Sequence, residues 1–148
     1  MPRRPPGALR AQTRYARGSQ PRPFSQIRGL RRNAQAAVRR LEARRFEPGY
    51  LSRALGQYEE FLRQPGRWLY VPLPDCPCHD VLGARDEIEA MLPALLPRAR
   101  CELGRIVAGL DTEFERRTLP DPYAARRPSS VRPDASGRPW WYRRLTGP

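Results

Sequence analysis

The chain has 148 residues; 28 are arginine, none is lysine, and the 15 acidic residues leave a formal net charge of +13. Its 18 prolines and 11 glycines follow no three-residue period, which excludes a collagen-like fibre. Three cysteines are too few for a disulfide-dense secreted scaffold, and no apolar run is long enough to span a bilayer.

The charge is distributed unevenly along the chain. Residues 1–47 hold 13 arginines and two acidic residues, residues 48–120 hold nine and 11, and residues 121–148 hold six and two. A nearly neutral middle between basic ends is typical of a small globular body with cationic arms. Because nucleic acid is the commonest polyanion in a cell, this pattern predicts nucleic acid as the partner.

The first 24 residues contain five prolines and few large apolar side chains. Such a segment cannot bury enough surface to offset the loss of chain entropy, so we expect a disordered basic arm. The charged start leads into no apolar stretch, so we expect no secretory signal. The predicted location is the cytoplasm, where three cysteines would stay reduced.

Two amphipathic helices are predicted in the first half of the chain. The first begins after Ser25, a suitable N-cap, and continues to about Phe46. The second runs from about Tyr50 to Gln64, where Pro65 and Gly66 end it. In both segments the apolar residues recur at steps of three and four: Ile27, Leu30, Ala34, Ala37, Val38 and Leu41, and then Leu51, Ala54, Leu55, Tyr58 and Leu62.

Two further helices are predicted after a connector. Residues 67–74 are rich in aromatic and β-branched side chains but contain two prolines, which favours an extended connector. Residues 81–95 form the third helix, kinked or ended at Pro93, and Pro97 suits the first turn of the fourth. The fourth helix also carries a stripe of small residues, which predicts that a second segment covers it: Cys101, Gly104, Ala108 and Thr112.

These elements predict an all-α fold, a small bundle of three or four helices with an extended Pro-rich connector and disordered basic termini. The predicted organisation is a basic Pro/Arg arm over 1–24, a helical domain over 25–120, and a Pro/Arg linker with a Trp-Arg tail over 121–148.

One short stretch is rich in metal-ligating side chains. In an extended conformation Cys76 and Cys78 point the same way, and His79 could add a third ligand. Cys101 could supply a fourth if the small-residue stripe packs beneath this stretch. Zinc is the ion that such ligands suit. The alternative is a turn with small, partly buried thiols and no metal.

We expect no enzymatic activity. A Cys–His pair would have to use the chain's single histidine, His79, which lies in a Pro-rich turn rather than in a nucleophile motif. The sequence has no Gly-rich phosphate loop, no HExxH and no GxSxG.

An aromatic and cationic cluster lies near the end of the chain. Trp140 and Trp141 could stack on unpaired bases while Arg143 and Arg144 bind phosphates. Two alternatives remain open: the tryptophans fold back and cap the bundle, or they anchor at a membrane interface.

The first predicted helix carries a second cationic cluster. Arg28, Arg32 and Arg39 are expected together on one flank of its apolar stripe, with Arg31 and Arg40 on either side. The alternative is an ordinary solvated helix face. The excess of 13 arginines over two acidic residues in residues 1–47 favours contact with a polyanion.

Three stretches between roughly residues 74 and 144, PDCPCHDVLGAR, LPRARCELGRIVAGLDTEFERRTLPDP and PWWYRR, resemble small, uncharacterised, arginine-rich and lysine-poor proteins of actinobacteria. The resemblance implies a bacterial, cytosolic setting and carries no implication for mechanism.

The sequence as a whole predicts a non-enzymatic protein that binds the phosphate backbone of DNA or RNA through its basic arm and first helix. The alternative is a helical protein-interaction module, stapled by zinc or not, whose arms contact an acidic protein surface.

Overall fold

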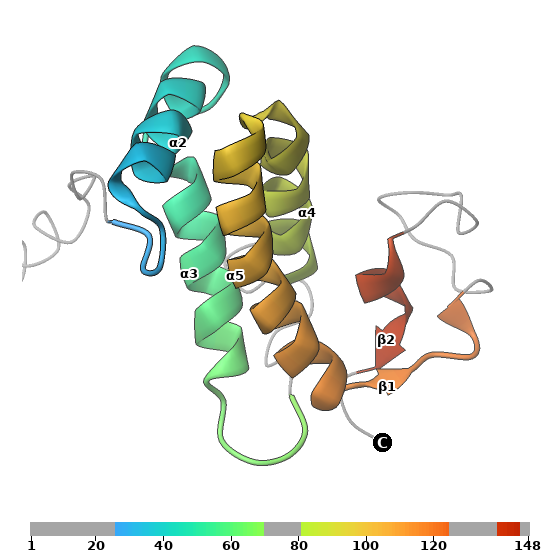
Figure 1. Ribbon diagram of the computed structural model, residues 1–148. Coiled ribbons are helices and arrows are strands. Elements are labelled where there is room, and N and C mark those ends of the chain that lie inside the picture. The colour runs from blue at the N-terminus through green and yellow to red at the C-terminus, as the bar shows by residue number, and fades with distance from the viewer. Residues whose placement is uncertain (1–25, 70–80, 125–138, 146–148) are drawn as a thin grey trace, which may run out of the picture.

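A computed structural model describes residues 26–69, 81–124 and 139–145. The main elements are four α-helices, and a 3-10 turn, η2 (Leu92–Ala94), continues the third of them (Figure 1). The helices are α2 (Arg32–Arg45), α3 (Tyr50–Leu62), α4 (Val81–Met91) and α5 (Pro97–Arg116). The predicted small all-α bundle is confirmed. The predicted arm over residues 1–24 and most of the Pro-rich connector lie outside the described residues.

A short C-terminal segment completes the fold. It consists of a 3-10 turn, η4 (Trp140–Arg143), followed by β2 (Arg144–Leu145). The two-residue strand β2 pairs antiparallel with β1 (Leu119–Pro120), and Leu145 lies opposite Leu119. This pairing places the segment beside the C-terminal end of α5 (Figure 1).

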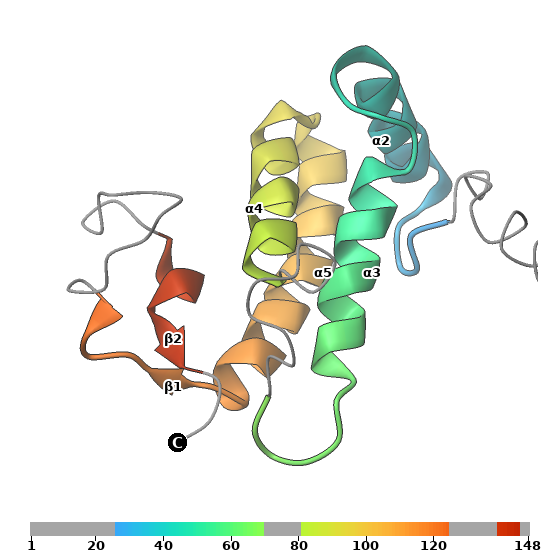
Figure 2. The ribbon, with the colours of Figure 1, turned by 180° about the vertical axis from the view of Figure 1, so that it is seen from behind.

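The helices pack around one core. α3 lies chiefly against α4, and α2 lies chiefly against α5, with α5 behind α3 and α4 in the view from behind (Figure 2). The apolar stripes of all four helices meet there, as their spacing predicts. The largest fully buried side chains are Leu51, Tyr58, Leu69, Ile88, Met91, Leu103 and Phe114.

The predicted start of the first helix was wrong. α2 begins at Arg32, whereas residues 28 and 29 form a turn in which Gly29 has a φ of 88°. A left-handed residue interrupts a right-handed helix, and only glycine adopts this conformation readily. Ile27 is nevertheless buried, and its carbonyl accepts a 2.6 Å hydrogen bond from the side-chain amide of Gln35.

The other predicted boundaries lie close to those observed. α3 ends at Leu62, two residues before the predicted end. α4 ends at Met91, and the chain continues as η2, which contains Pro93. Pro97 occupies the first turn of α5, where its missing N–H costs no helical hydrogen bond.

Within the described residues, no segment covers the small-residue side of α5. Cys101, Ala108 and Thr112 are exposed, and within the described structure no heavy atom lies within 4 Å of a Cβ placed on Gly104. α5 buries a single stripe, which contains Leu103, Val107 and Phe114. Small residues on the opposite side of α5 would allow another segment to pack closely, but their presence alone does not bring such a segment there.

A carboxylate from α2 caps the N-terminus of α3. Gly49 is the N-cap residue of α3 and has no side chain with which to accept hydrogen bonds. Glu42 is only 2% exposed and accepts 3.1 Å and 2.9 Å hydrogen bonds from the backbone N–H groups of Gly49 and Leu51. A negative side chain at this position satisfies free amide groups and interacts favourably with the helix dipole.

A guanidinium from the end of α5 binds the opposite end of α3. Arg117 is buried and donates hydrogen bonds to the carbonyl oxygens of Leu62, Gln64, Gly66 and Arg67. The last carbonyl groups of a helix have no partner within the helix, so a buried cation at this position satisfies them. Charged side chains from α2 and α5 therefore hold α3 at both ends.

A second buried arginine joins α4 to α5. Arg85 forms a two-pronged ion pair with Asp111, at 3.0 and 3.1 Å, and also bonds to Glu89. Tyr58 of α3 donates a 2.9 Å hydrogen bond to the same Asp111 carboxylate. Burial raises the pKa of Tyr58 above its ordinary value of 10.0, and the negative charge of Asp111 raises it further.

We expect Glu42→Ala to lower the free energy of unfolding by about 1–3 kcal/mol, because it leaves the amide groups at the start of α3 without an acceptor. Urea unfolding followed by circular dichroism measures the change. Glu47→Ala removes an exposed carboxylate five residues away and should change stability by less than about 0.5 kcal/mol. Equal losses in the two variants would contradict the capping role.

Tyr58 should make stability depend on alkaline pH. Because its pKa is higher in the folded than in the unfolded chain, the stability it contributes is present below about pH 10 and is lost as the pH rises. We expect Tyr58→Phe to reduce the fall in unfolding free energy above pH 10 by about 1.4 kcal/mol per pH unit. Tyr123→Phe, at an exposed tyrosine, should keep the wild-type slope. Urea titrations at several pH values between 8 and 11 measure how the unfolding free energy depends on pH. Identical slopes in wild type and Tyr58→Phe would refute this role of Tyr58.

Candidate nucleic-acid interface

The solvent face of α2 consists of arginines and small residues. Arg32, Arg39, Arg40 and Arg44 are exposed on this face. At 100° per residue they fall within one arc of the helix, opposite the buried Ala34 and Val38. Between the arginines lie only Asn33, Ala36 and Ala43. A bulky polyanion can therefore approach the helix backbone closely while guanidinium groups reach it from both sides.

The only acidic residue of α2 does not lie on this face. Glu42 is buried and bound to the start of α3. Seven arginines lie between residues 28 and 45, and the cap withdraws the only carboxylate of α2 itself from this surface. The outer surface of α2 therefore has a positive potential.

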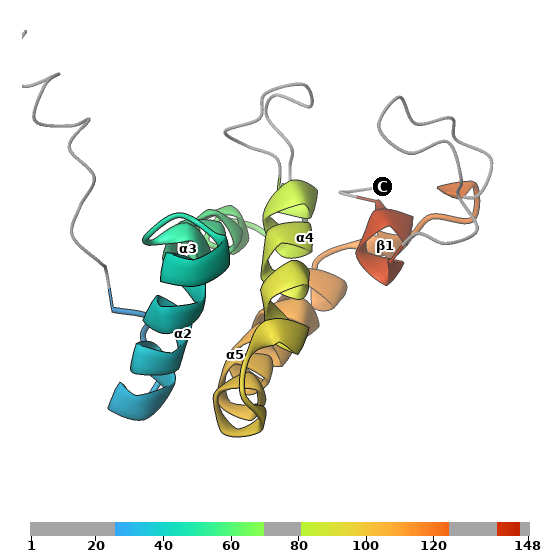
Figure 3. The same cartoon turned by 90° about the horizontal axis from the view of Figure 1, so that it is seen from above.

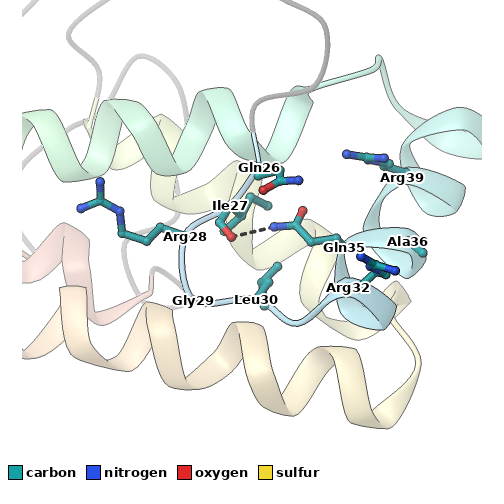
Figure 4. Close-up of a pocket in the computed structure, with 9 residues that line it drawn as sticks. All are labelled: Gln26, Ile27, Arg28, Gly29, Leu30, Arg32, Gln35, Ala36 and Arg39. Atoms are coloured by element: carbon teal, nitrogen blue, oxygen red, sulfur yellow. Dashed lines mark hydrogen bonds between the residues drawn. The ribbon is translucent and has the colours of Figure 1, made fainter.

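A groove opens where the chain enters α2 (Figure 4). It has a volume of about 720 Å³, and Arg28 lies at one end of it while Arg32 and Arg39 lie at the other. The hydrogen bond between Gln35 and the Ile27 carbonyl lies between them. The sequence predicted Arg28 on the same helix as Arg32 and Arg39, and this prediction was wrong. Arg28 precedes α2, because the turn at Gly29 separates it from the helix.

The first half of α5 extends the positive surface. Glu102 of α5 accepts a 3.1 Å hydrogen bond from the backbone N–H of Arg31, which places this side of α5 against the start of α2. Arg98 and Arg105 lie four residues before and three residues after Glu102, so they share its side of the helix, and both are exposed. The sequence alone did not indicate these two arginines, because they belong to the nearly neutral residues 48–120.

Elsewhere on the bundle, exposed arginines pair with nearby acidic residues. Arg63 at the end of α3 pairs with Glu59 and Glu60, and Arg116 at the end of α5 pairs with Glu113 at 2.7 Å. Arg53 lies 3.8 Å from Glu87. The positive charge of these three arginines is therefore offset locally.

The tail tryptophans pack on the bundle. Trp141 is 5% exposed, its indole N–H donates a 3.0 Å hydrogen bond to Asp86 of α4, and the guanidinium of Arg85 lies 4.1 Å from the ring centre. Trp140 contacts Phe114 edge to face. Of the alternatives drawn from the sequence, the structure shows the one in which the tryptophans cap the bundle, and the ring of Trp141 is not open to a base.

The two tail arginines differ in their surroundings. Arg144 donates hydrogen bonds to the carbonyl oxygens of Glu115 and Thr118 and to the Thr118 hydroxyl. It therefore binds the C-terminal end of α5 in the way that Arg117 binds that of α3. Arg143 is exposed. Arg144 is engaged within the fold, and Arg143 lies on the surface of the docked segment.

Three of the predicted metal ligands, Cys76, Cys78 and His79, lie outside the described residues. Cys101 is an exposed free cysteine on α5. Asp111 lies ten residues after Cys101 on α5. At a rise of about 1.5 Å per residue the separation is about 15 Å, and Asp111 is already paired with Arg85. In the described part of the chain no three His, Cys, Asp or Glu side chains are grouped to hold a metal. The zinc site stays a prediction.

The helices of the described segments are too short or too polar to cross a lipid bilayer.

The burial of Trp141 can be tested by fluorescence. In the variant Trp68→Phe/Trp140→Phe, the only remaining indole is that of Trp141. We expect its emission to resist quenching by acrylamide and to stay unchanged when an oligonucleotide is added to saturation, because the ring is covered. The same variant in denaturing urea gives the exposed reference. Strong quenching by the oligonucleotide would mean that Trp141 leaves the bundle and stacks on bases.

No protein-family model, no curated protein and no solved structure matches this chain. The resemblance to actinobacterial proteins therefore stays a prediction.

Proposed function

We propose that the protein binds nucleic acid through the phosphate backbone, with α2 and the adjoining start of α5 as the contact surface. One observation carries the proposal. The solvent face of α2 presents exposed arginines separated by small residues, while the helix's only carboxylate is buried as the cap of α3.

The chemistry of this surface favours phosphate contacts over base reading. Guanidinium groups bind phosphate oxygens in a planar, two-pronged geometry. The arginines of this surface are distributed along the groove and the helix face rather than gathered at one point. Four of them are Arg28, Arg32, Arg39 and Arg40. Such a surface follows a charged backbone without selecting a base sequence. Binding should therefore show little sequence preference and weaken steeply with salt, because the free energy comes from counterion release.

The proposal includes the basic arm over residues 1–24, because its composition predicts that it binds nucleic acid. This arm lies outside the described residues. Deleting it together with Arg28→Ala, Arg32→Ala and Arg39→Ala should remove most of the affinity for duplex DNA. The three substitutions in the full-length chain test the described surface alone.

We expect Arg28→Ala/Arg32→Ala/Arg39→Ala to weaken duplex binding and to reduce the slope of log K against log salt by about 2–3, since each lost phosphate contact removes about 0.9. Fluorescence anisotropy with a labelled duplex of arbitrary sequence, between 50 and 200 mM salt, measures both. The matched control is Arg53→Ala/Arg63→Ala/Arg116→Ala, which removes the same charge from exposed, ion-paired positions.

The control triple should bind more tightly than the α2 triple at every salt concentration. Equal losses in the two triples would show that net charge alone governs binding and would overturn the assignment to α2. Wild-type binding too weak to detect at 100 mM salt, with duplex and single-stranded probes alike, would overturn the function itself.

A further inference from the structure

A second groove lies on the other flank of α2. It has a volume of about 490 Å³ and is formed by the C-terminal half of α2 together with the turn that joins α4 to α5. Figure 3 shows these two parts of the molecule from above. Leu41, Leu95 and Leu96 contribute apolar surface, and Arg40, Arg44 and Arg45 contribute positive charge.

The most exposed large apolar side chain of the described residues belongs to this groove. Leu96 is 66% exposed and contributes to the wall of the groove, where Pro93 and Ala94 add further exposed apolar surface. A single exposed leucine is ordinary, but a leucine set in a recess beside three arginines forms a mixed surface. No acidic side chain is among the described residues that line it.

We infer that this groove binds an acidic amphipathic helix of another protein. Apolar side chains on one face of the helix would cover Leu96 and Leu41, and carboxylates at the edges of that face would pair with Arg40, Arg44 and Arg45. Helices that dock in grooves place their anchors at three- and four-residue steps, and the charges at the rim select the partner.

The mixed lining distinguishes this occupant from nucleic acid. A phosphate backbone would satisfy the arginines but would leave the leucines in water. The described lining contains no aromatic ring on which a base could stack. A recess also fits a projecting side chain better than it fits the flat surface of a lipid bilayer.

The parts of the sequence outside the described residues contain only three acidic residues. Residues 1–25 contain no acidic residue and residues 125–138 contain only Asp134. Residues 70–80 contain two aspartates among three prolines, which break an α-helix. Charge complementarity therefore indicates a second protein.

The test uses a labelled synthetic peptide of about 18 residues, made of leucine, glutamate and alanine, with leucines at helical spacing on one face. A second peptide of the same composition has its leucines spread around the helix. Fluorescence anisotropy with the full-length protein should show that the first binds at least about tenfold more tightly, the factor that burying one leucine supplies.

Leu96→Ser should weaken binding of the first peptide about tenfold or more. The matched control is Tyr123→Ser, because Tyr123 is also largely exposed, at 60%, but does not line the groove, and it should leave binding unchanged. Arg44→Ala/Arg45→Ala should weaken binding of the first peptide and should not steepen the salt dependence of that binding.

Equal affinity for the two peptides, or wild-type affinity in Leu96→Ser, would overturn the inference. So would a Leu96→Ser variant that loses binding to vesicles containing phosphatidylserine while it keeps binding to the peptide, because the surface would then face a membrane. Duplex DNA binding by Leu96→Ser should equal that of wild type, so this inference and the proposed function can fail separately.

Discussion

The contact on which the rest of the structure depends is the carboxylate of Glu42 at the start of α3. The N-cap residue of α3 is a glycine, which has no side chain to serve as a cap, so the first amide groups of the helix need an acceptor from elsewhere in the fold. Glu42 supplies it and fixes α2 against α3 by two hydrogen bonds. The same contact removes the only negative charge of α2 from solvent. A requirement of folding therefore creates the positive surface to which we assign the function.

The arginines of this chain have two distinct roles. Arg85, Arg117 and Arg144 lie within the fold, where they bind carboxylates or the carbonyl groups at helix ends. Such groups stabilise because each guanidinium has several donors in a planar arrangement that can satisfy several acceptors at once. The arginines of α2 instead face water. An overall net charge of +13 does not distinguish the two roles, and only the second role supports binding of a polyanion.

The C-terminal segment packs against α4 and covers that side of the bundle. Trp141 covers the guanidinium of Arg85, and Asp86 binds both the indole of Trp141 and, at 2.6 Å, the hydroxyl of Tyr142. The ion pair between Arg85 and Asp111 is thereby shielded from solvent, which strengthens it. The aromatic residues near the end of the chain thus complete the core, and the folded body includes residues 139–145 in addition to the helices.

The sequence by itself determined the fold class, a count of three or four helices and most of their ends. Pro65 and Gly66, Pro93, and Pro97 act through local backbone restrictions, so their effects on helix boundaries can be predicted without knowledge of neighbours. The apolar stripes likewise predicted most of the core, because the period of a helix fixes which side chains share a face.

Only the tertiary structure decided how the charged and aromatic residues are used. Glu42 has the same local pattern as an exposed helix glutamate, and its role appears only when α3 lies beside it. Arg98 and Arg105 were counted together with 11 acidic residues, most of which lie outside α5. Trp141 fits base stacking or packing equally well in sequence, and Asp86 and Arg85 resolve the choice. Electrostatic and aromatic contacts join residues far apart in the chain, so no local pattern specifies their partners.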